Sequence, residues 1–214
     1  ERPPIEKKEE MEIYGFEGMK FKTETGELTF EQIMLVFNDL PVDLTFVDEN
    51  NKVDEAINHL LEQKNIGFDT ETRPAFKKGQ INKVALMQLS CEDICYLFRL
   101  NKIGYPDRLD EIISNLQIKK IGLSLRDDFD AIRGRSNNKP LNFVDLQPFV
   151  DKYGIEDNSL QRIYAIIFGK KISKRQRLSN WETKELTEAQ KSYAAIDAWA
   201  CLRIYNHLIK NGKQ

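Results

Sequence analysis

Apolar positions along the chain fall into short continuous or alternating stretches that predict six β-strands. The stretch "KVALMQLS" is typical, because most of its residues are apolar. Successive side chains of a strand point to opposite faces, so a strand covered on both faces is apolar over most of its length. The polar link of Cys91, Glu92 and Asp93 between two such stretches predicts a hairpin. The six predicted strands cover residues 43–49, 65–71, 83–90, 93–100, 119–125 and 141–146.

Apolar residues spaced three and four apart predict helices between these strands. Thr187 and Gln190 form a capping box at the start of the last helix, and Gly134 and Gly169 end two others. The predicted helices cover residues 51–64, 107–116, 126–134, 159–169 and 187 to about 210, and residues 29–40 can form a further short helix capped by Thr29. Helices that alternate with strands, together with one hairpin, indicate an α/β sandwich with a mixed sheet.

Composition indicates one domain and excludes several classes of protein. The 214 residues are 41% hydrophobic and 31% charged, with a net charge of −2, so any binding of nucleic acid must depend on local basic patches. No apolar run reaches the roughly 18 residues that span a bilayer, and "ERPPIEKKEE" is too polar for a signal peptide. The three cysteines form no even framework, which favours reduced thiols and a cytoplasmic protein. We expect a partly flexible N-terminal extension at 1–42 and one domain at 43–214.

Carboxylates stand at three places where a structural role is hard to assign. Asp69 and Glu71 lie two apart at the end of a predicted strand, so both face one side of the sheet. The segment "RDDFD" opens a helix with Asp127, Asp128 and Asp130. Asp197 sits in the apolar run "AAIDAWA", where no Lys or Arg at three or four residues' distance can pair with it.

Each of these signals is weak alone. An Asp-x-Glu pair is common by chance, acidic residues at a helix start usually complement the helix dipole, and Tyr193 one turn before Asp197 can simply share its surface. Taken together, their placement is best explained by convergence on divalent cations. Oxygen-only ligand sets suit Mg²⁺ or Mn²⁺, and two such ions about 3.5–4 Å apart can drive displacement at phosphorus.

The same segments resemble a known family. "FDTET", "IGLSLRDDFDAI" and "SYAAIDAWA" are similar to the three motifs of the DEDD exonucleases, and the Tyr four residues before the last Asp is similar to the DEDDy branch. Together with "NFVDL", "SNW" and "LTEAQ", they resemble the RNase D-type 3′–5′ exonucleases and the exonuclease domain of the Werner syndrome helicase, over roughly residues 45 to 210. The resemblance implies a ribonuclease H-like α/β fold, with a five-stranded mixed sheet flanked by helices.

The resemblance also implies roles for particular residues. Asp69, Glu71, Asp128 and Asp197 would bind two Mg²⁺ or Mn²⁺ ions, and Tyr193 would orient the attacking water. Asp127 or Asp130 could replace Asp128, because all three crowd the second motif. The implied reaction is metal-dependent hydrolysis from the 3′ end of DNA or RNA to nucleoside 5′-monophosphates. The alternative is a binding or scaffold module that has kept the fold and lost turnover, and the oligomeric state stays open.

Two basic segments are candidates for a substrate track, although charge runs are usually solvated loops. Arg73, Lys77 and Lys78 follow the first motif, with Phe76 among them as a possible stacking platform for a base. A second basic run, in "GKKISKRQRLSNW", lies just before Trp181 and precedes the last helix. From it we single out Lys174, Arg175 and Trp181.

Overall fold

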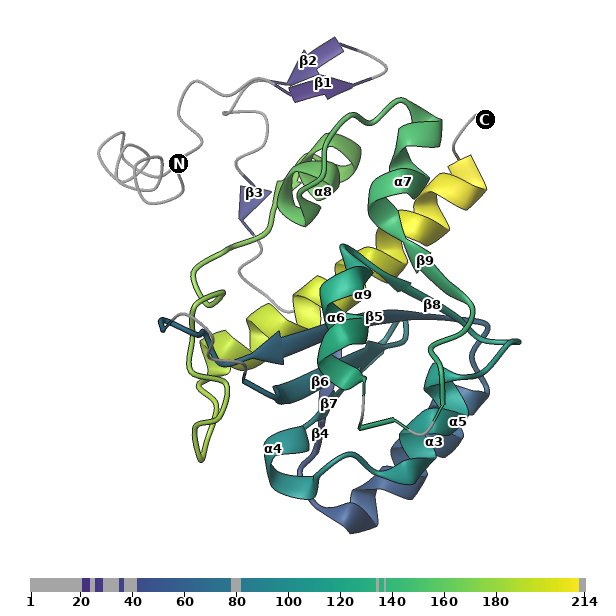
Figure 1. Cartoon of the computed structure of the whole chain (residues 1–214). Coiled ribbons are helices and arrows are strands. Elements are labelled where there is room, and N and C mark those ends of the chain that lie inside the picture. The colour runs from purple at the N-terminus through teal and green to yellow at the C-terminus, as the bar shows by residue number, and fades with distance from the viewer. Residues whose placement is uncertain are drawn as a thin grey trace.

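A six-stranded mixed β-sheet with helices on both faces forms the centre of the fold (Figure 1). The computed structural model describes residues 21–23, 26–28, 35–36, 42–77, 82–133, 135–136 and 138–211, with side chains from residue 42 onward. The strands of the sheet are β4 (Asp43–Val47), β5 (Asn65–Thr72), β6 (Val84–Ser90), β7 (Ile94–Phe98), β8 (Lys119–Gly122) and β9 (Phe143–Asp145). They run in the order β4–β7–β6–β5–β8–β9.

All six predicted strands are therefore confirmed, and the five-stranded sheet that the family resemblance implied is corrected to six. β4 pairs in parallel with β7 at one edge of the sheet. β7, β6 and β5 are antiparallel neighbours, whereas β5, β8 and β9 are parallel. The hairpin is also confirmed, because the Cys91 N–H donates to the Ile94 carbonyl at 2.7 Å between β6 and β7.

Two short strand pairs lie outside this sheet. β1 (Phe21–Thr23) pairs with β2 (Gly26–Leu28), and β3 (Leu35–Val36) pairs in parallel with β10 (Lys170–Lys171). The helix predicted over 29–40 is thus wrong at Leu35 and Val36, where long-range pairing with β10 overrides the local pattern. Thr29 and the rest of that prediction lie outside the described residues.

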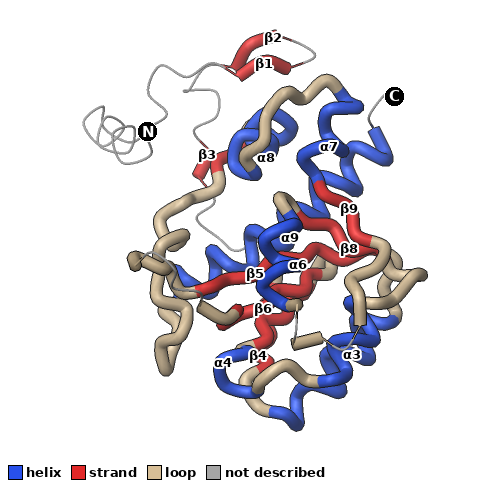
Figure 2. Tube along the Cα trace, in the orientation of Figure 1, coloured by secondary structure: helices blue, strands red, loops and turns tan. Residues whose placement is uncertain are grey.

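Helices cover both faces of the sheet, as the blue tubes around the red strands show (Figure 2). The predicted capping box is confirmed: the Gln190 N–H donates to the Thr187 hydroxyl at 3.2 Å, and the Thr187 N–H donates to the Gln190 side chain at 3.0 Å. The helices are η1 (Asn50–Lys52), α3 (Val53–Leu61), α4 (Leu100–Ile103), η2 (Asp107–Leu109), α5 (Asp110–Ile113), α6 (Leu125–Ile132), α7 (Leu146–Val150), η3 (Asp151–Tyr153), α8 (Leu160–Phe168) and α9 (Glu188–Asn211).

Two helix predictions differ from the structure in detail. Residues 107–116 form η2 and α5 and stop at Ile113, so Leu116, which was predicted on the apolar face, is exposed. α6 stops at Ile132, and the predicted stop Gly134 lies outside the described residues. Among the described helices, none is long and apolar enough to cross a membrane.

The sheet separates two hydrophobic cores. One lies under α7, α8 and α9 and includes Leu86 and Leu97. The other lies under α3, α5 and α6 and includes Phe68 and Met87. Because both faces are covered, every residue of the central strand β6 is buried.

α9 lies directly on β5 because residue 67 has no side chain. A Cβ atom at Gly67 would stand 1.9 Å from the carbonyl oxygen of Ala198. Real contacts of this kind are much longer, so any larger residue would push α9 away from the sheet. This close approach places the buried run around Asp197 against the strand that carries Asp69 and Glu71.

We expect Gly67→Ala to destabilise the protein by about 1–3 kcal/mol or more, because α9 must move to make room for the methyl group. Gly154→Ala is the control: nothing lies within 4 Å of its added Cβ, and its φ of +75° isolates backbone strain, which costs about 1 kcal/mol. Urea unfolding of both variants measures the difference. Equal losses in the two variants would contradict the tight contact.

Candidate active site

β5 places two carboxylates on the face of the sheet that α9 covers. Asp69 and Glu71 are two residues apart, so their side chains point the same way as Gly67. Asp69 is half-buried and Glu71 is buried. The strand therefore delivers two acidic side chains into an environment that water reaches poorly.

α9, which packs on this face of the sheet, contributes a third carboxylate. Asp197 is 7% exposed, and its Oδ1 has no hydrogen-bond partner among the described residues. One carboxylate oxygen each from Asp69, Glu71 and Asp197 lie within 4.8 Å of one another. That arrangement of oxygen atoms fits a hard divalent cation, because such cations prefer carboxylate oxygens.

Asp128 of α6 completes the acidic group. The Thr70 hydroxyl, from the same strand as Asp69, donates a hydrogen bond to the Asp128 carboxylate. Asp127 and Asp130 are exposed, and Asp130 pairs with Arg133 at 2.9 Å. Of the three candidates in the second motif, the structure brings Asp128 to the other carboxylates.

Asp145, which the sequence analysis missed, fixes the start of α6. Its carboxylate accepts from the backbone N–H groups of Ser124 (3.1 Å), Leu125 (3.0 Å) and Gln147 (3.0 Å). Ser124 has a φ of +59°, so the turn before α6 is strained and needs such support. The position of Asp145 at the end of the predicted strand 141–146 was the signal that could have identified it, because the ends of parallel strands meet at one edge of a sheet.

Burial is the largest cause of a raised pKa at each of the four carboxylates, and at Asp69 and Glu71 the charges of the other members raise the pKa further. The pKa of Asp69 lies well above its ordinary value, with further contributions from Asp128, Glu71 and Asp197. Burial, Asp197 and Asp128 raise the pKa of Glu71 to about 9, and burial raises that of Asp128 to about 6 against the hydrogen bond from Thr70. Full ionisation near neutral pH therefore needs added positive charge.

Asp197 is held by two neighbours. Burial raises its pKa to about 7, while a hydrogen bond from Tyr193 and the charge of Lys174 oppose that rise. Burial, followed by the charges of Asp197 and Glu71, raises the pKa of Tyr193, so its hydroxyl remains protonated. Tyr193 can therefore donate a hydrogen bond at the edge of the acidic group.

The predicted substrate residues have different environments. Lys174 is near enough to Asp197 for their charges to interact, and Arg175 and Lys77 are exposed. Arg73 forms an ion pair with Glu182 at 3.3 Å, which ties the end of β5 to the loop before α9. Phe76 is 84% exposed, as a stacking platform requires. Lys78 lies outside the described residues.

Trp181 does not offer the surface that the sequence analysis expected. Its side chain is fully buried, and its ring lies 6.0 Å from that of Tyr193, centroid to centroid. Trp181 therefore makes a core contact and not the predicted contact with substrate. Trp181 packs behind Tyr193.

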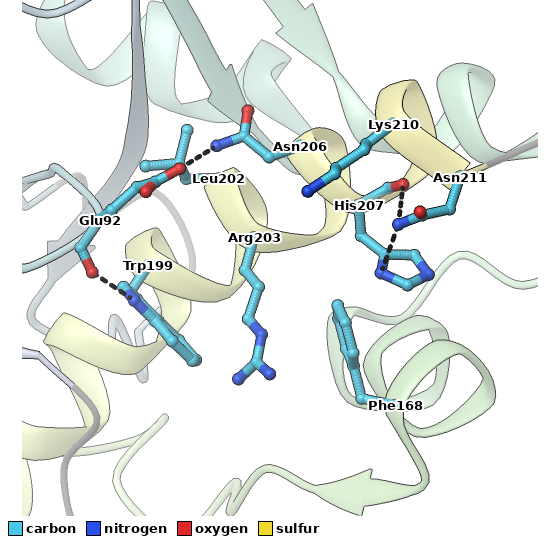
Figure 3. Close-up of a pocket in the computed structure, with 9 residues that line it drawn as sticks. All are labelled: Glu92, Phe168, Trp199, Leu202, Arg203, Asn206, His207, Lys210 and Asn211. Carbon is cyan, nitrogen blue, oxygen red and sulfur yellow. Dashed lines mark hydrogen bonds between the residues drawn. The ribbon is translucent and has the colours of Figure 1, made fainter.

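A separate cavity of about 420 Å³ lies along the second half of α9 (Figure 3). Arg203 projects between the rings of Trp199 and Phe168, with distances of 4.9 and 4.6 Å from its guanidinium carbon to the ring centroids. The Trp199 ring N–H donates to the Glu92 carbonyl at 3.1 Å. The carboxylates of Asp69, Glu71, Asp128 and Asp197 do not line this cavity. The cavity is therefore distinct from the acidic site, although α9 contributes residues to both.

Comparison with known proteins assigns the family. The family model described as 3′-5′ exonuclease matches residues 44–213, and the chain belongs to this family. The bifunctional 3′-5′ exonuclease/ATP-dependent helicase WRN of Mus musculus is 36% identical over 149 residues, which cover 67% of this chain and 11% of that protein.

Two solved structures support the fold. The EXO domain of Aedes aegypti Nibbler has a TM-score of 0.72 at 24% identity, covering 80% of this chain and 90% of that one. Escherichia coli RNase D has a TM-score of 0.72 at 19% identity, covering 79% and 45%. The chain thus spans only a small part of its mouse relative and under half of RNase D.

The burial of Asp197 predicts that Asp197→Asn stabilises the metal-free protein at neutral and higher pH. The pKa of Asp197 rises on folding from 3.8 to about 7, so its ionisation opposes folding increasingly as pH rises between those values. We expect the variant to gain roughly 2–4 kcal/mol at pH 8 and almost nothing near pH 4. Thermal unfolding of both proteins in EDTA measures this.

An equal loss of stability at both pH values would show instead that Asp197 is a paired structural residue. Added Mg²⁺ provides a further check. It should stabilise the wild type far more than the variant, because binding to the folded state alone raises its stability.

Proposed function

We propose that this chain is a metal-dependent 3′–5′ exonuclease that hydrolyses nucleic acid from the 3′ end to nucleoside 5′-monophosphates. The observation that carries the proposal is the convergence of Asp69, Glu71 and Asp197 within 4.8 Å, with Asp128 joined to the same strand through Thr70. Membership of the 3′-5′ exonuclease family supports it. We assign the activity to residues 43–214 and regard 1–42 as an N-terminal extension.

The residues fit two divalent ions of the Mg²⁺ or Mn²⁺ class. Asp69, Glu71, Asp128 and Asp197 supply oxygen ligands, the Asp197 Oδ1 lacks a protein partner in the described part of the chain, and the carboxylates need positive charge to ionise together. When bound, such ions make water a better nucleophile and stabilise the charge that develops at phosphorus and on the leaving oxygen.

The chain's own residues position the reactants. The protonated hydroxyl of Tyr193, held beside Asp197 and backed by Trp181, can hydrogen-bond the attacking water and align it with the last phosphodiester. Water attacks phosphorus, the bond to the 3′-oxygen breaks, and that oxygen takes a proton to become the new 3′ hydroxyl. The released product is a nucleoside 5′-monophosphate.

The substrate is a nucleic-acid chain with a free 3′ end, DNA or RNA. A structure of Trypanosoma brucei RNase D, which shares this fold, was solved with RNA U12. Lys174 near Asp197 and the exposed Phe76 and Lys77 beyond β5 offer cations and an aromatic face for such a strand. Arg73 contributes through its ion pair with Glu182, which joins these two segments.

We expect cleavage that needs both a free end and a divalent cation. With Mg²⁺ or Mn²⁺, linear 5′-labelled DNA or RNA should shorten from its 3′ end, while a circular strand of the same sequence stays intact. EDTA should stop the reaction, and Asp69→Ala should lower the rate at least about 100-fold. Labelled mononucleotide is measured by chromatography.

Equal degradation of the circular strand would contradict the exonuclease proposal, and full activity in EDTA would contradict the role of metal. Binding of the oligonucleotide without cleavage of DNA or RNA under either metal would favour the alternative of a non-catalytic binding module.

A second prediction tests the basic loop. Lys174→Ala combined with Arg175→Ala should raise KM and reduce the slope of log affinity against log salt by about 1 unit, because each phosphate contact on a single strand contributes about 0.7. At saturating substrate and saturating metal, kcat should change less than KM, since we expect these side chains to contact the strand and not the reacting atoms. Fluorescence anisotropy with a labelled single strand in EDTA measures the affinity.

The charge-matched control is Lys64→Ala combined with Lys210→Ala. Lys64 precedes β5 at the end opposite the carboxylates, and Lys210 stands near the end of α9. If both double variants have the wild-type affinity and salt slope, the loop is only solvated, and the track must run past Lys77.

A further inference from the structure

Gln88 is a buried amide that has no hydrogen-bond partner in the described part of the chain. It lies in the middle of β6 and is 0% exposed. Neither its Nε2 nor its Oε1 has a hydrogen-bond partner among the described residues. A buried polar group left without a partner costs about 1–3 kcal/mol, so the amide works against stability.

The position of Gln88 explains where a partner can come from. In the pairing of β5 with β6, Gln88 stands directly opposite Asp69, and Leu86 stands opposite Glu71. Residues opposite one another on antiparallel strands point to the same face, with Cβ atoms about 4.5–5.5 Å apart. The amide therefore lies on the α9 side of the sheet, next to Asp69.

Other polar side chains near Gln88 have hydrogen-bond partners. Of the seven residues of β6, Ser90 is the other polar one, and the Ser90 hydroxyl donates to the Cys91 carbonyl at 2.9 Å. Among the acidic residues, Asp128 has the Thr70 hydroxyl and Asp197 has the Tyr193 hydroxyl as side-chain donors. In the described part of the chain, no side chain donates such a bond to Asp69.

We propose that Gln88 is a positioning residue for Asp69: in the metal-loaded enzyme its Nε2 donates a hydrogen bond to the Asp69 carboxylate oxygen that faces the sheet. The inference rests on the proposed function, because the bond would hold the Asp69 carboxylate in the orientation that a bound cation needs. Partners of this kind orient a ligand and raise its basicity, and their loss typically lowers metal affinity or activity 10- to 100-fold.

The test is Gln88→Met, which keeps the length and approximate volume of the side chain and removes its polar atoms. The metal-free variant should unfold at the wild-type temperature or above it, since a buried unpaired amide has been removed. Its Mn²⁺ affinity, measured by calorimetry without substrate, should fall 10- to 100-fold. Its kcat should fall by a similar factor at sub-saturating Mn²⁺, with KM for the oligonucleotide within about two-fold.

Leu86→Met is the matched control, because it lies two residues away on the same strand and face, opposite Glu71. It should keep the wild-type Mn²⁺ affinity. If Gln88→Met does not fold, Gln88→Asn keeps an amide but withdraws it by one methylene, and it should show the same loss of affinity.

Wild-type Mn²⁺ affinity in Gln88→Met would overturn the positioning role, and so would a loss confined to metal-free stability. A wild-type protein that neither binds Mn²⁺ nor cleaves would instead overturn the proposed function, so the two failures can be told apart.

Discussion

The contact between β5 and α9 at Gly67 determines the arrangement of the site. Because residue 67 has no Cβ, the backbone of α9 can approach until the Ala198 carbonyl occupies the space that a side chain would fill. Asp197 is the residue immediately before Ala198 on α9, and Asp69 lies two residues after Gly67 on β5. The separation between these carboxylates is therefore set by two backbones in contact, which move far less than side chains.

This arrangement has an energetic cost that function explains. Burial disfavours ionisation of Asp69, Glu71 and Asp197, and like charge adds to this effect at Asp69 and Glu71. The packing that stabilises the fold therefore also brings these acidic groups together. Gln88 adds an unpaired amide beside them. Active sites commonly combine such unfavourable features, because a site arranged for a ligand is unsatisfied without it.

Residues outside the group of four carboxylates maintain the geometry around it. Asp145 holds the turn that starts α6, Thr70 binds the Asp128 carboxylate, and Trp181 packs behind Tyr193. These contacts link β9, β5 and the loop before α9 to the acidic residues. Elements distant in sequence therefore hold the acidic side chains in place, and the positions of these side chains depend on the packing of the whole domain.

The sequence by itself determined the local structure and the chemistry. Alternation and helical spacing predicted six strands and the principal helices, because the hydrophobic period of a strand or a helix can be recognised within a few consecutive residues. The apolar flanks of Asp197 and the pairing of Asp69 with Glu71 marked them as candidate site residues, because packing preference and charge are local properties. The tertiary structure decided what depends on residues far apart. It brought Asp128 rather than Asp127 or Asp130 to the other acids, turned Leu35 and Val36 into a strand through pairing with β10, and buried Trp181 against Tyr193. It also placed Gln88 opposite Asp69, because strand register follows from how the sheet closes and not from either strand alone.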